Sequence, residues 1–241
     1  MIIIKNDKEI DLMRIAGRIV AETLLLVEKE VRPGITTAEL DRIAEEFITK
    51  HGAKPSFKGL YGFPASLCIS VNEQVVHGIP GGYVLKEGDI ISVDCGANIN
   101  GFHGDAARTF AVGNISEEAK RLIKVTEESF FKGLEFAKVG NKLTDISHEI
   151  QRYVEVSGFS VVREFVGHGI GKSVHEDPEV PNFGRPGRGP KLVAGMALAI
   201  EPMVNMGTYR VATLGDDWTV VSADKSLSAH YENTVVILPD G

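Results

Sequence analysis

The sequence predicts a single α+β domain in which two similar αβ halves share one curved, mainly antiparallel sheet with helices on its outer face. Two pairs of amphipathic helical segments recur along the 241 residues, and strand-like runs follow each pair. No linker or low-complexity segment separates the two halves. We therefore expect an N-terminal half over about residues 1–112 and a C-terminal half over about 113–241 of one domain.

Each helix is predicted from a capping residue, a stripe of apolar residues and a glycine that ends or breaks the segment. In the first pair, Asn6 with Glu9 caps an apolar stripe over residues 10–31 that Gly34 follows, and Thr36 with Glu39 caps a stripe over residues 40–48 that Gly52 follows. In the second pair, Ser116 caps a stripe over residues 122–130 that Gly140 follows, and Thr144 caps a stripe over residues 146–154 that Gly158 follows. Residues 34, 40, 44, 47 and 52 match residues of compatible type 106 positions later. We interpret the match as an internal duplication; the alternative is that two unrelated amphipathic pairs align by chance.

The predicted strands are short runs rich in β-branched residues and bounded by Gly, Asn, Asp or Pro. They cover residues 67–71, 90–93 and 109–112 in the first half, and 161–166, 197–200, 219–222 and 234–238 in the second. Asn98-Ile99-Asn100-Gly101 predicts a hairpin turn between two of them.

Composition narrows the class of protein. The formal net charge of −7 argues against a protein that tracks a nucleic-acid backbone, and we interpret the basic cluster Arg185, Arg188 and Lys191 as a solvated loop. The two cysteines, Cys68 and Cys95, do not make a disulfide framework. The sequence shows no signal peptide and no apolar run of about 20 residues. We expect a cytoplasmic protein without membrane contact, and a monomer by default.

Four acidic residues interrupt or flank the strand-like runs: Asp94, Asp105, Glu201 and Glu232. Any one of them could be an ordinary strand-end cap or turn residue. Four together, two in each half, would face one another across a two-fold axis, and buried like charges need cations. We therefore predict a site for two divalent cations.

His168 would add a nitrogen ligand, because it follows a strand-like run and has glycines on both sides that allow close approach of the backbone. Its alternative role is a surface or capping histidine. Cys95 neighbours Asp94 but should point to the opposite face of the sheet, so we do not expect it to be a ligand. One imidazole and four carboxylates suit Mn, Fe(II), Co or Zn.

Several motifs together resemble type I methionine aminopeptidases in their short bacterial form, over almost the whole chain. They are Ser70 to Pro80 (SVNEQVVHGIP), Asp94 with Asp105, Gly167 to Gly171 (GHGIG) with His175-Glu176, Glu201-Pro202, and Glu232-Asn233-Thr234. The resemblance implies the pseudo-two-fold "pita-bread" fold. It also implies that the five metal ligands are Asp94, Asp105, His168, Glu201 and Glu232, with Asp105 and Glu232 bridging two ions.

The same resemblance implies roles for residues around the metals. His77 and His175 match two histidines that hold the substrate peptide and act in catalysis, and Glu201 matches a ligand that can also shuttle a proton. Phe63, Cys68 and Trp218 match the lining of a methionine pocket, whereas Leu60 and Val174 depart from the usual aromatic residues there. From the residues alone, His77 could be an ordinary loop histidine and Trp218 a packing residue. His51, His103, His148 and His230 receive no role.

The activity implied is removal of the initiator methionine from nascent polypeptides with a small second residue, with transient ribosome contact. Two alternatives remain: an Xaa-Pro aminopeptidase or prolidase with the same ligands, and a non-catalytic binding protein of the same fold.

Overall fold

The computed structural model describes residues 1–239, which form four α-helices, one short 3-10 helix and a set of antiparallel strands. The helices are α1 (Asp7–Glu30), α2 (Thr37–Lys50), η1 (Leu60–Gly62), α3 (Glu117–Leu134) and α4 (Leu143–Val156). None of them combines the length and the apolar character that spanning a bilayer requires, among residues 1–239.

The helix starts follow the capping signals, with one exception. The side chain of Asn6 accepts a hydrogen bond from the amide of Glu9 at 3.1 Å, and Glu9 Oε2 accepts the amide of Asn6 at 3.0 Å. Thr36 and Glu39 repeat this capping box at the start of α2. The expected cap at Thr144 is wrong, because α4 begins two residues earlier than that cap implies.

Lys142 is the N-cap residue of α4, and Asp145 Oδ2 accepts its backbone amide at 2.8 Å. An acidic residue at the third helical position can thus satisfy the free N–H without a capping side chain before it. The Thr144 hydroxyl instead donates to the carbonyl of Arg188 at 3.0 Å, which ties the loop of the basic residues to the helix start. Arg185, Arg188 and Lys191 are all exposed, as expected for a solvated loop.

The strands form four hydrogen-bonded sheets, and neighbouring strands within each sheet are antiparallel. In chain order they are β1 (Lys54–Pro55), β2 (Leu67–Val71), β3 (Gln74–Val76), β4 (Ile90–Ile99), β5 (Phe102–Ala111), β6 (Ser160–Val161), β7 (Gly167–Gly169), β8 (Glu176–Val180), β9 (Ala197–Ile200), β10 (Met203–Asn205), β11 (Val211–Thr213), β12 (Val220–Ser222), β13 (Ser228–His230) and β14 (Asn233–Val236). The mixed helix and antiparallel strand composition confirms the predicted fold class.

Three predicted strands differ clearly from the observed ones, and one of them, over 90–93, covers only the start of β4. The prediction over 161–166 is wrong beyond β6, because the chain leaves the sheet after Val162 and Arg163 stacks over the Tyr209 ring at 4.1 Å. The prediction over 109–112 finds only the end of β5, a ten-residue strand that pairs with β4 along its whole length. The predicted turn is present: Asn100 and Gly101 both have positive φ, at 54° and 82°.

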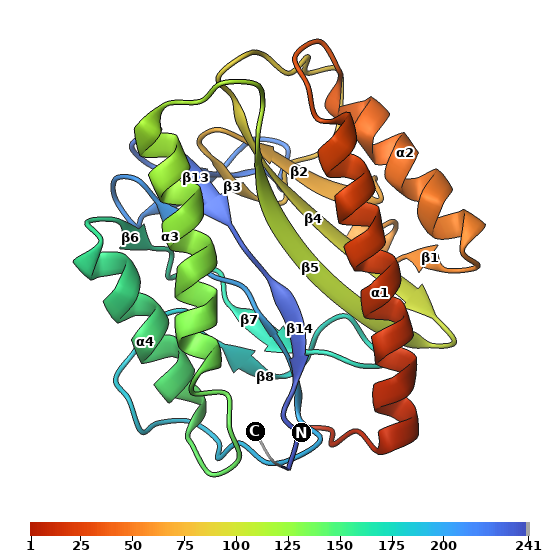
Figure 1. The fold of residues 1–241 in the computed structure, drawn as a ribbon, viewed down its shortest axis with the longest axis vertical. Helices are drawn as coiled ribbons and strands as arrows, with labels where there is room; N and C mark the ends of the chain where they lie inside the picture. Colours follow the sequence, from red (N-terminus) through yellow and green to blue (C-terminus); the bar gives the residue numbers. More distant parts are fainter. Residues whose placement is uncertain (240–241) are drawn as a thin grey trace.

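Two hydrophobic cores lie under the two helix pairs, which Figure 1 shows on opposite sides of the molecule, with the strands between and behind them. The first core joins α1 and α2 to β2 and β4, and the second joins α3 and α4 to β9 and β10. Strand β5 of the first half meets the start of β14 of the second. Ala107 and Glu232 exchange backbone hydrogen bonds of 3.3 and 3.0 Å, and the amide of Asp105 donates to Thr234 Oγ1 at 2.9 Å.

Matching elements of the two halves keep the offset seen in the sequence. Helix α4 begins and ends 106 residues after α2, and β6 stands 106 residues after β1. Gly34 and Gly140 have φ of +95° and +100°, and Gly52 and Gly158 have +75° and +81°. These correspondences support the interpretation of an internal duplication, which stays a prediction.

Candidate active site

The β4–β5 hairpin places the first two acids. Asp94 lies opposite Ala107, and Asp105 lies opposite Gly96, so the two carboxylates are diagonal neighbours on one face of the pair. Cys95 packs into the core on the other face, as predicted, among residues of α1 and α2. The hairpin thus presents two carboxylates, without a thiol, to the centre of the molecule.

The second half contributes the other two acids and the histidine. Asn233 of β14 pairs with Ile200 of β9, so that Glu232 and Glu201 come next as facing residues at the ends of these strands. His168 on β7 pairs with Ala199. Its Nε2 lies 3.6 Å from Glu201 Oε1 and 3.9 Å from Asp105 Oδ2. Like charges directly opposite on paired strands are destabilising, so this arrangement serves something other than the sheet.

The glycines around His168 are required by close backbone contacts. A Cβ at Gly167 would lie 2.3 Å from the carbonyl oxygen of Ala199, and one at Gly169 would lie 2.0 Å from that of Asp177. Any side chain at either position would push β7 away from its neighbours and move the imidazole. The glycines that suggested a ligand in the sequence therefore hold His168 within reach of the acids.

Burial and mutual repulsion dominate the electrostatics of this cluster. Burial raises the pKa of Asp94 to about 7. The pKa values of Asp105, Glu201 and Glu232 are also raised well above the ordinary range, first by burial and then by the charges of the neighbouring acids. Burial lowers the pKa of His168 to about 4, so its imidazole is neutral near pH 7. A neutral imidazole is the form that binds a metal.

The same residues fit divalent cations. Three buried carboxylate oxygens have no hydrogen-bond partner among residues 1–239: Asp94 Oδ1, Asp105 Oδ1 and Glu232 Oε1. Ligand atoms of Asp105, His168 and Glu232 lie within 4.8 Å of one another. His168 Nδ1 lies 2.8 Å from the carbonyl of Gly169, a partner that leaves Nε2 free to bind. Buried oxygens without partners are costly, and cations would satisfy them.

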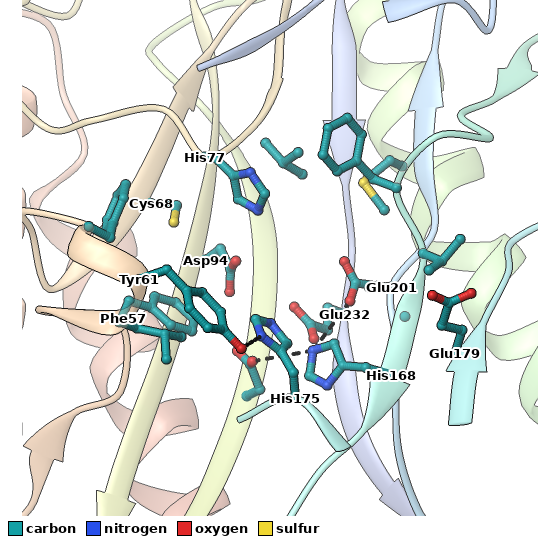
Figure 2. Close-up of a pocket in the computed structure, with 18 of the residues that line it drawn as sticks. Phe57, Tyr61, Cys68, His77, Asp94, His168, His175, Glu179, Glu201 and Glu232 are labelled. Atoms are coloured by element: carbon teal, nitrogen blue, oxygen red, sulfur yellow. Dashed lines mark hydrogen bonds and ion pairs between the residues drawn. The ribbon is translucent and has the colours of Figure 1, made fainter. Parts of the chain in front are cut away.

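The acids and His168 line a cavity of about 700 Å³, together with His77 and His175. Figure 2 shows His77 at one side of the cavity, above Asp94, and His175 next to His168 near the acids. The His77 ring contacts Phe165 edge-on, with 5.6 Å between ring centroids, and its backbone has a positive φ of 59°. The His175 ring meets His168 edge-on at 4.5 Å. The structure therefore brings both predicted histidines to the cavity.

An apolar cluster forms one wall of the cavity and contains the predicted pocket residues. It consists of Phe57, Leu60, Phe63, Ala65, Cys68, Ile79, Val174 and Trp218. Phe63 meets Trp218 edge-on at 5.1 Å. Burial raises the pKa of the Cys68 thiol, so it stays protonated and acts as a small apolar group. Of the two departures, Leu60 lines the cavity, whereas Val174 is a buried member of the same apolar cluster.

Tyr61 and His230 lie next to predicted site residues, although the sequence predicted no role for either. Tyr61 is 75% exposed, stacks against the His175 ring, and places its hydroxyl 3.4 Å from His175 Nδ1. No pattern in the sequence could indicate this contact between residues 114 positions apart. His230 is 2% exposed, and its Nε2 lies 3.7 Å from Glu201 Oε2.

The sequence carries one signal for this contact: His230 stands two residues before Glu232, which puts both side chains on the same side of an extended chain. The other three histidines without a role bind elsewhere. His51 contacts the carbonyl of Phe47, His103 contacts Ser56 and Asn98, and His148 contacts the carbonyl of Gly184.

Comparisons with known proteins agree with one another. The family model of metallopeptidase family M24 matches residues 11–239. A methionine aminopeptidase of Clostridium perfringens is 78% identical over all of this chain and 97% of that protein. Methionine aminopeptidase 1 of Bacillus subtilis is 58% identical over all of this chain and 97% of that protein.

Solved structures give the same picture and show how widely the fold is shared. The structure of methionine aminopeptidase from Rickettsia prowazekii superposes with a TM-score of 0.99 at 43% identity, covering all of this chain and 98% of that one. An Xaa-Pro dipeptidase from Bacillus anthracis shares the fold with a TM-score of 0.80 at 24% identity, and this chain covers 60% of it.

Proposed function

Because the chain belongs to metallopeptidase family M24 and is a methionyl aminopeptidase, we propose that it removes the initiator methionine from newly made proteins whose second residue is small. The observation that supports this most directly is the set of three buried carboxylate oxygens without partners beside an apolar wall. A polar centre for hydrolysis next to a pocket for a thioether side chain is what this reaction needs.

We propose Asp94, Asp105, His168, Glu201 and Glu232 as the ligands of two divalent cations, with Asp105 and Glu232 shared between them. Mn, Fe(II), Co and Zn all suit one imidazole and four carboxylates. When bound, the two cations would lower the pKa of a water molecule so that it can attack a carbonyl carbon near neutral pH. The raised pKa of the acids means that protons compete with the cations for these oxygens.

The protein's own side chains would orient the peptide and handle the protons. His175, at the open end of the cavity, would donate a hydrogen bond to the oxyanion that develops on the scissile carbonyl. His77, across the cavity, would hydrogen-bond the backbone on the leaving side of the peptide bond. Glu201 would carry a proton to the leaving amine, the role that the family resemblance implies for this ligand.

Phe63, Cys68 and Trp218 would hold the methionine side chain against the apolar wall. Leu60 and Val174, which are smaller than the usual aromatic residues, would leave more room in that wall. A flexible unbranched thioether fits an irregular apolar pocket better than a branched side chain does.

The setting of the reaction follows from the substrate. We propose that the protein acts in the cytoplasm on nascent polypeptide N-termini, with transient ribosome contact, as a monomer and without binding nucleic acid or membrane. The two free, buried cysteines are consistent with a reducing compartment.

A peptide assay across metals tests this proposal. The metal-free protein is loaded with Mn, Fe(II), Co or Zn and given Met-Gly-Met-Met, the dipeptide Met-Ala and the dipeptide Ala-Pro. We expect turnover of both methionine peptides with at least one metal, and none of Ala-Pro. Preferential cleavage of Ala-Pro would favour the Xaa-Pro alternative, and no turnover with any metal would favour the non-catalytic one.

The variant Asp105→Asn tests the ligand assignment in the same assay. Replacing a proposed bridging carboxylate should remove metal binding and lower kcat/KM by more than about 100-fold. Losing a residue that only hydrogen-bonds a metal ligand already costs up to about 100-fold. Unchanged metal content and activity in Asp105→Asn would contradict the assignment.

A further inference from the structure

His230 is the last residue of β13 and lies next to two of the proposed metal ligands, Glu201 and Glu232. It pairs with Met203 of β10, and its backbone is fixed on both sides by Thr109: its amide donates to Thr109 Oγ1, and its carbonyl accepts from the same hydroxyl, each at 2.9 Å. The imidazole therefore starts from a rigid backbone, with its position set by the sheets rather than by a loop.

The environment of the imidazole Nε2 consists of carboxylates. Nε2 is buried, and no residue in the described part of the chain forms a hydrogen bond with it. Glu201 Oε2 lies 3.7 Å from it and Glu232 Oε2 lies 3.9 Å from it. An imidazole in its neutral form carries a proton on one of its two nitrogens. A buried N–H is expected to have an acceptor, and these two oxygens face it.

Glu201 thus stands between two imidazoles that face different oxygens. His168 Nε2 is closest to Oε1, and His230 Nε2 is closest to Oε2. The two rings differ in the hydrogen-bond partners that surround their nitrogens. His168 has the Gly169 carbonyl as a partner for Nδ1, which frees Nε2 as a metal ligand, whereas His230 has only carboxylate oxygens before its Nε2.

We propose that His230 is a positioning residue for the metal site: its Nε2–H donates to Glu201 Oε2 and so holds Oε1 toward His168 and the cations. This inference rests on the proposed function, since it takes Glu201 to be a metal ligand. The bond fixes the rotation of the carboxylate, which an extended glutamate side chain does not fix by itself. Outer partners of this kind set the orientation of a ligand and the affinity for the metal.

The test compares the variants His230→Leu and His230→Gln with the wild type in Co²⁺ binding as well as in activity. Leucine removes the donor, and glutamine keeps an N–H at the end of a side chain of similar reach. The matched control is His148→Leu, because His148 is a partly buried histidine on α4 outside the cavity. Affinity is measured by calorimetry and the ligand field by the visible spectrum of the Co²⁺ protein.

We expect His230→Leu to lose about 10- to 100-fold in Co²⁺ affinity and in kcat, with a small change in KM for Met-Gly-Met-Met. His230→Gln should return both quantities to within a few fold of the wild type, and His148→Leu should match the wild type. Thermal unfolding in EDTA checks that the metal-free variants are folded. If His230→Leu does not fold, His230→Asn, with a shorter side chain, takes its place with the same expectation.

Three outcomes separate the inference from the function beneath it. Wild-type affinity and spectrum in His230→Leu would overturn the positioning role while leaving the metal site intact. Affinity in His230→Gln as low as in His230→Leu, with a changed spectrum, would make His230 a metal ligand itself and overturn the inference. Failure of the wild type to bind Co²⁺ would overturn the proposed function, and this inference with it.

Discussion

Two groups of buried charge in this protein are built in opposite ways. Lys5 and Glu176 form an ion pair of 2.6 Å whose side chains are 3% and 6% exposed. The second Glu176 oxygen accepts the amides of Lys172 and Ser173, at 2.9 and 3.2 Å, so this carboxylate is fully used. The acids of the active site have raised pKa values and oxygens with no partner.

The difference shows which buried charges serve the fold and which serve the chemistry. Glu176 is neutralised by a cation that the chain itself supplies, and the pair ties the N-terminal segment to the loop that carries His175. The acids of the cavity are held together by the β4–β5 hairpin and by the sheet that contains β7, β9 and β14, although they repel one another. A protein keeps such a cluster only where it is useful, because it lowers stability until a cation arrives.

Breaking the Lys5–Glu176 pair should produce the larger effect on stability. In Lys5→Met the Glu176 carboxylate stays buried without its counterion, and removing one partner of a buried pair costs about 3–5 kcal/mol. Urea unfolding of the metal-free protein, in EDTA, measures this loss. The double variant Lys5→Met/Glu176→Gln should recover part of it, because no unpaired charge remains. A loss below about 1 kcal/mol in Lys5→Met would mean that the pair is not the structural counterpart proposed here.

Removing the charge of an active-site acid should instead increase the free energy of unfolding of the metal-free protein, by an amount that depends on pH. Burial raises the pKa of Asp94 to about 7, above the 3.8 of a free aspartate. A group with a raised folded-state pKa contributes stability that is full below about pH 4 and is lost as pH rises through about 7. As pH rises from 4 to 8, the free energy of unfolding of the metal-free Asp94→Asn variant should therefore increase by about 1–3 kcal/mol relative to that of the wild type.

Urea unfolding in EDTA at several pH values measures this gain, and excess Mn²⁺ should abolish it. With the cation bound, the wild-type carboxylate is the favoured form and the Asn variant loses the ligand. A stability difference between wild type and Asp94→Asn that stays constant across this range would contradict the raised pKa. It would also remove the contrast with the Lys5–Glu176 pair.

Local signals in the sequence predicted the parts of the site that depend on neighbours along the chain. The turn at Asn100-Gly101 requires positive φ, which fixed the hairpin and hence the common face of Asp94 and Asp105. The role of the glycines beside His168 could be predicted, because only glycine allows the backbone to approach its neighbours so closely. Capping residues likewise predicted three of the four helix starts, two of them as capping boxes.

Long-range contacts could not be predicted in this way. The contact between Tyr61 and His175 depends on how two distant loops meet, and the contact between His230 and Glu201 depends on how the end of β13 meets the end of β9. The short strands β3, β10 and β13 have only three residues each, too few for a periodic pattern. The roles of Phe63, Cys68 and Trp218 came only from the family resemblance, because an apolar residue in a pocket and one in a core look alike in sequence.

An exposed ion pair completes the comparison and should give the smallest effect. On α2, Arg42 Nη1 lies 2.7 Å from Glu46 Oε1, close to the distance in the buried Lys5–Glu176 pair, but these side chains are 62% and 65% exposed. Water and salt screen such a pair, so Arg42→Ala should change the free energy of unfolding by no more than about 0.5 kcal/mol. The measurement is the same urea titration, repeated at low and high salt. A loss as large as that of Lys5→Met would show that distance, rather than burial, sets the strength of ion pairs in this protein.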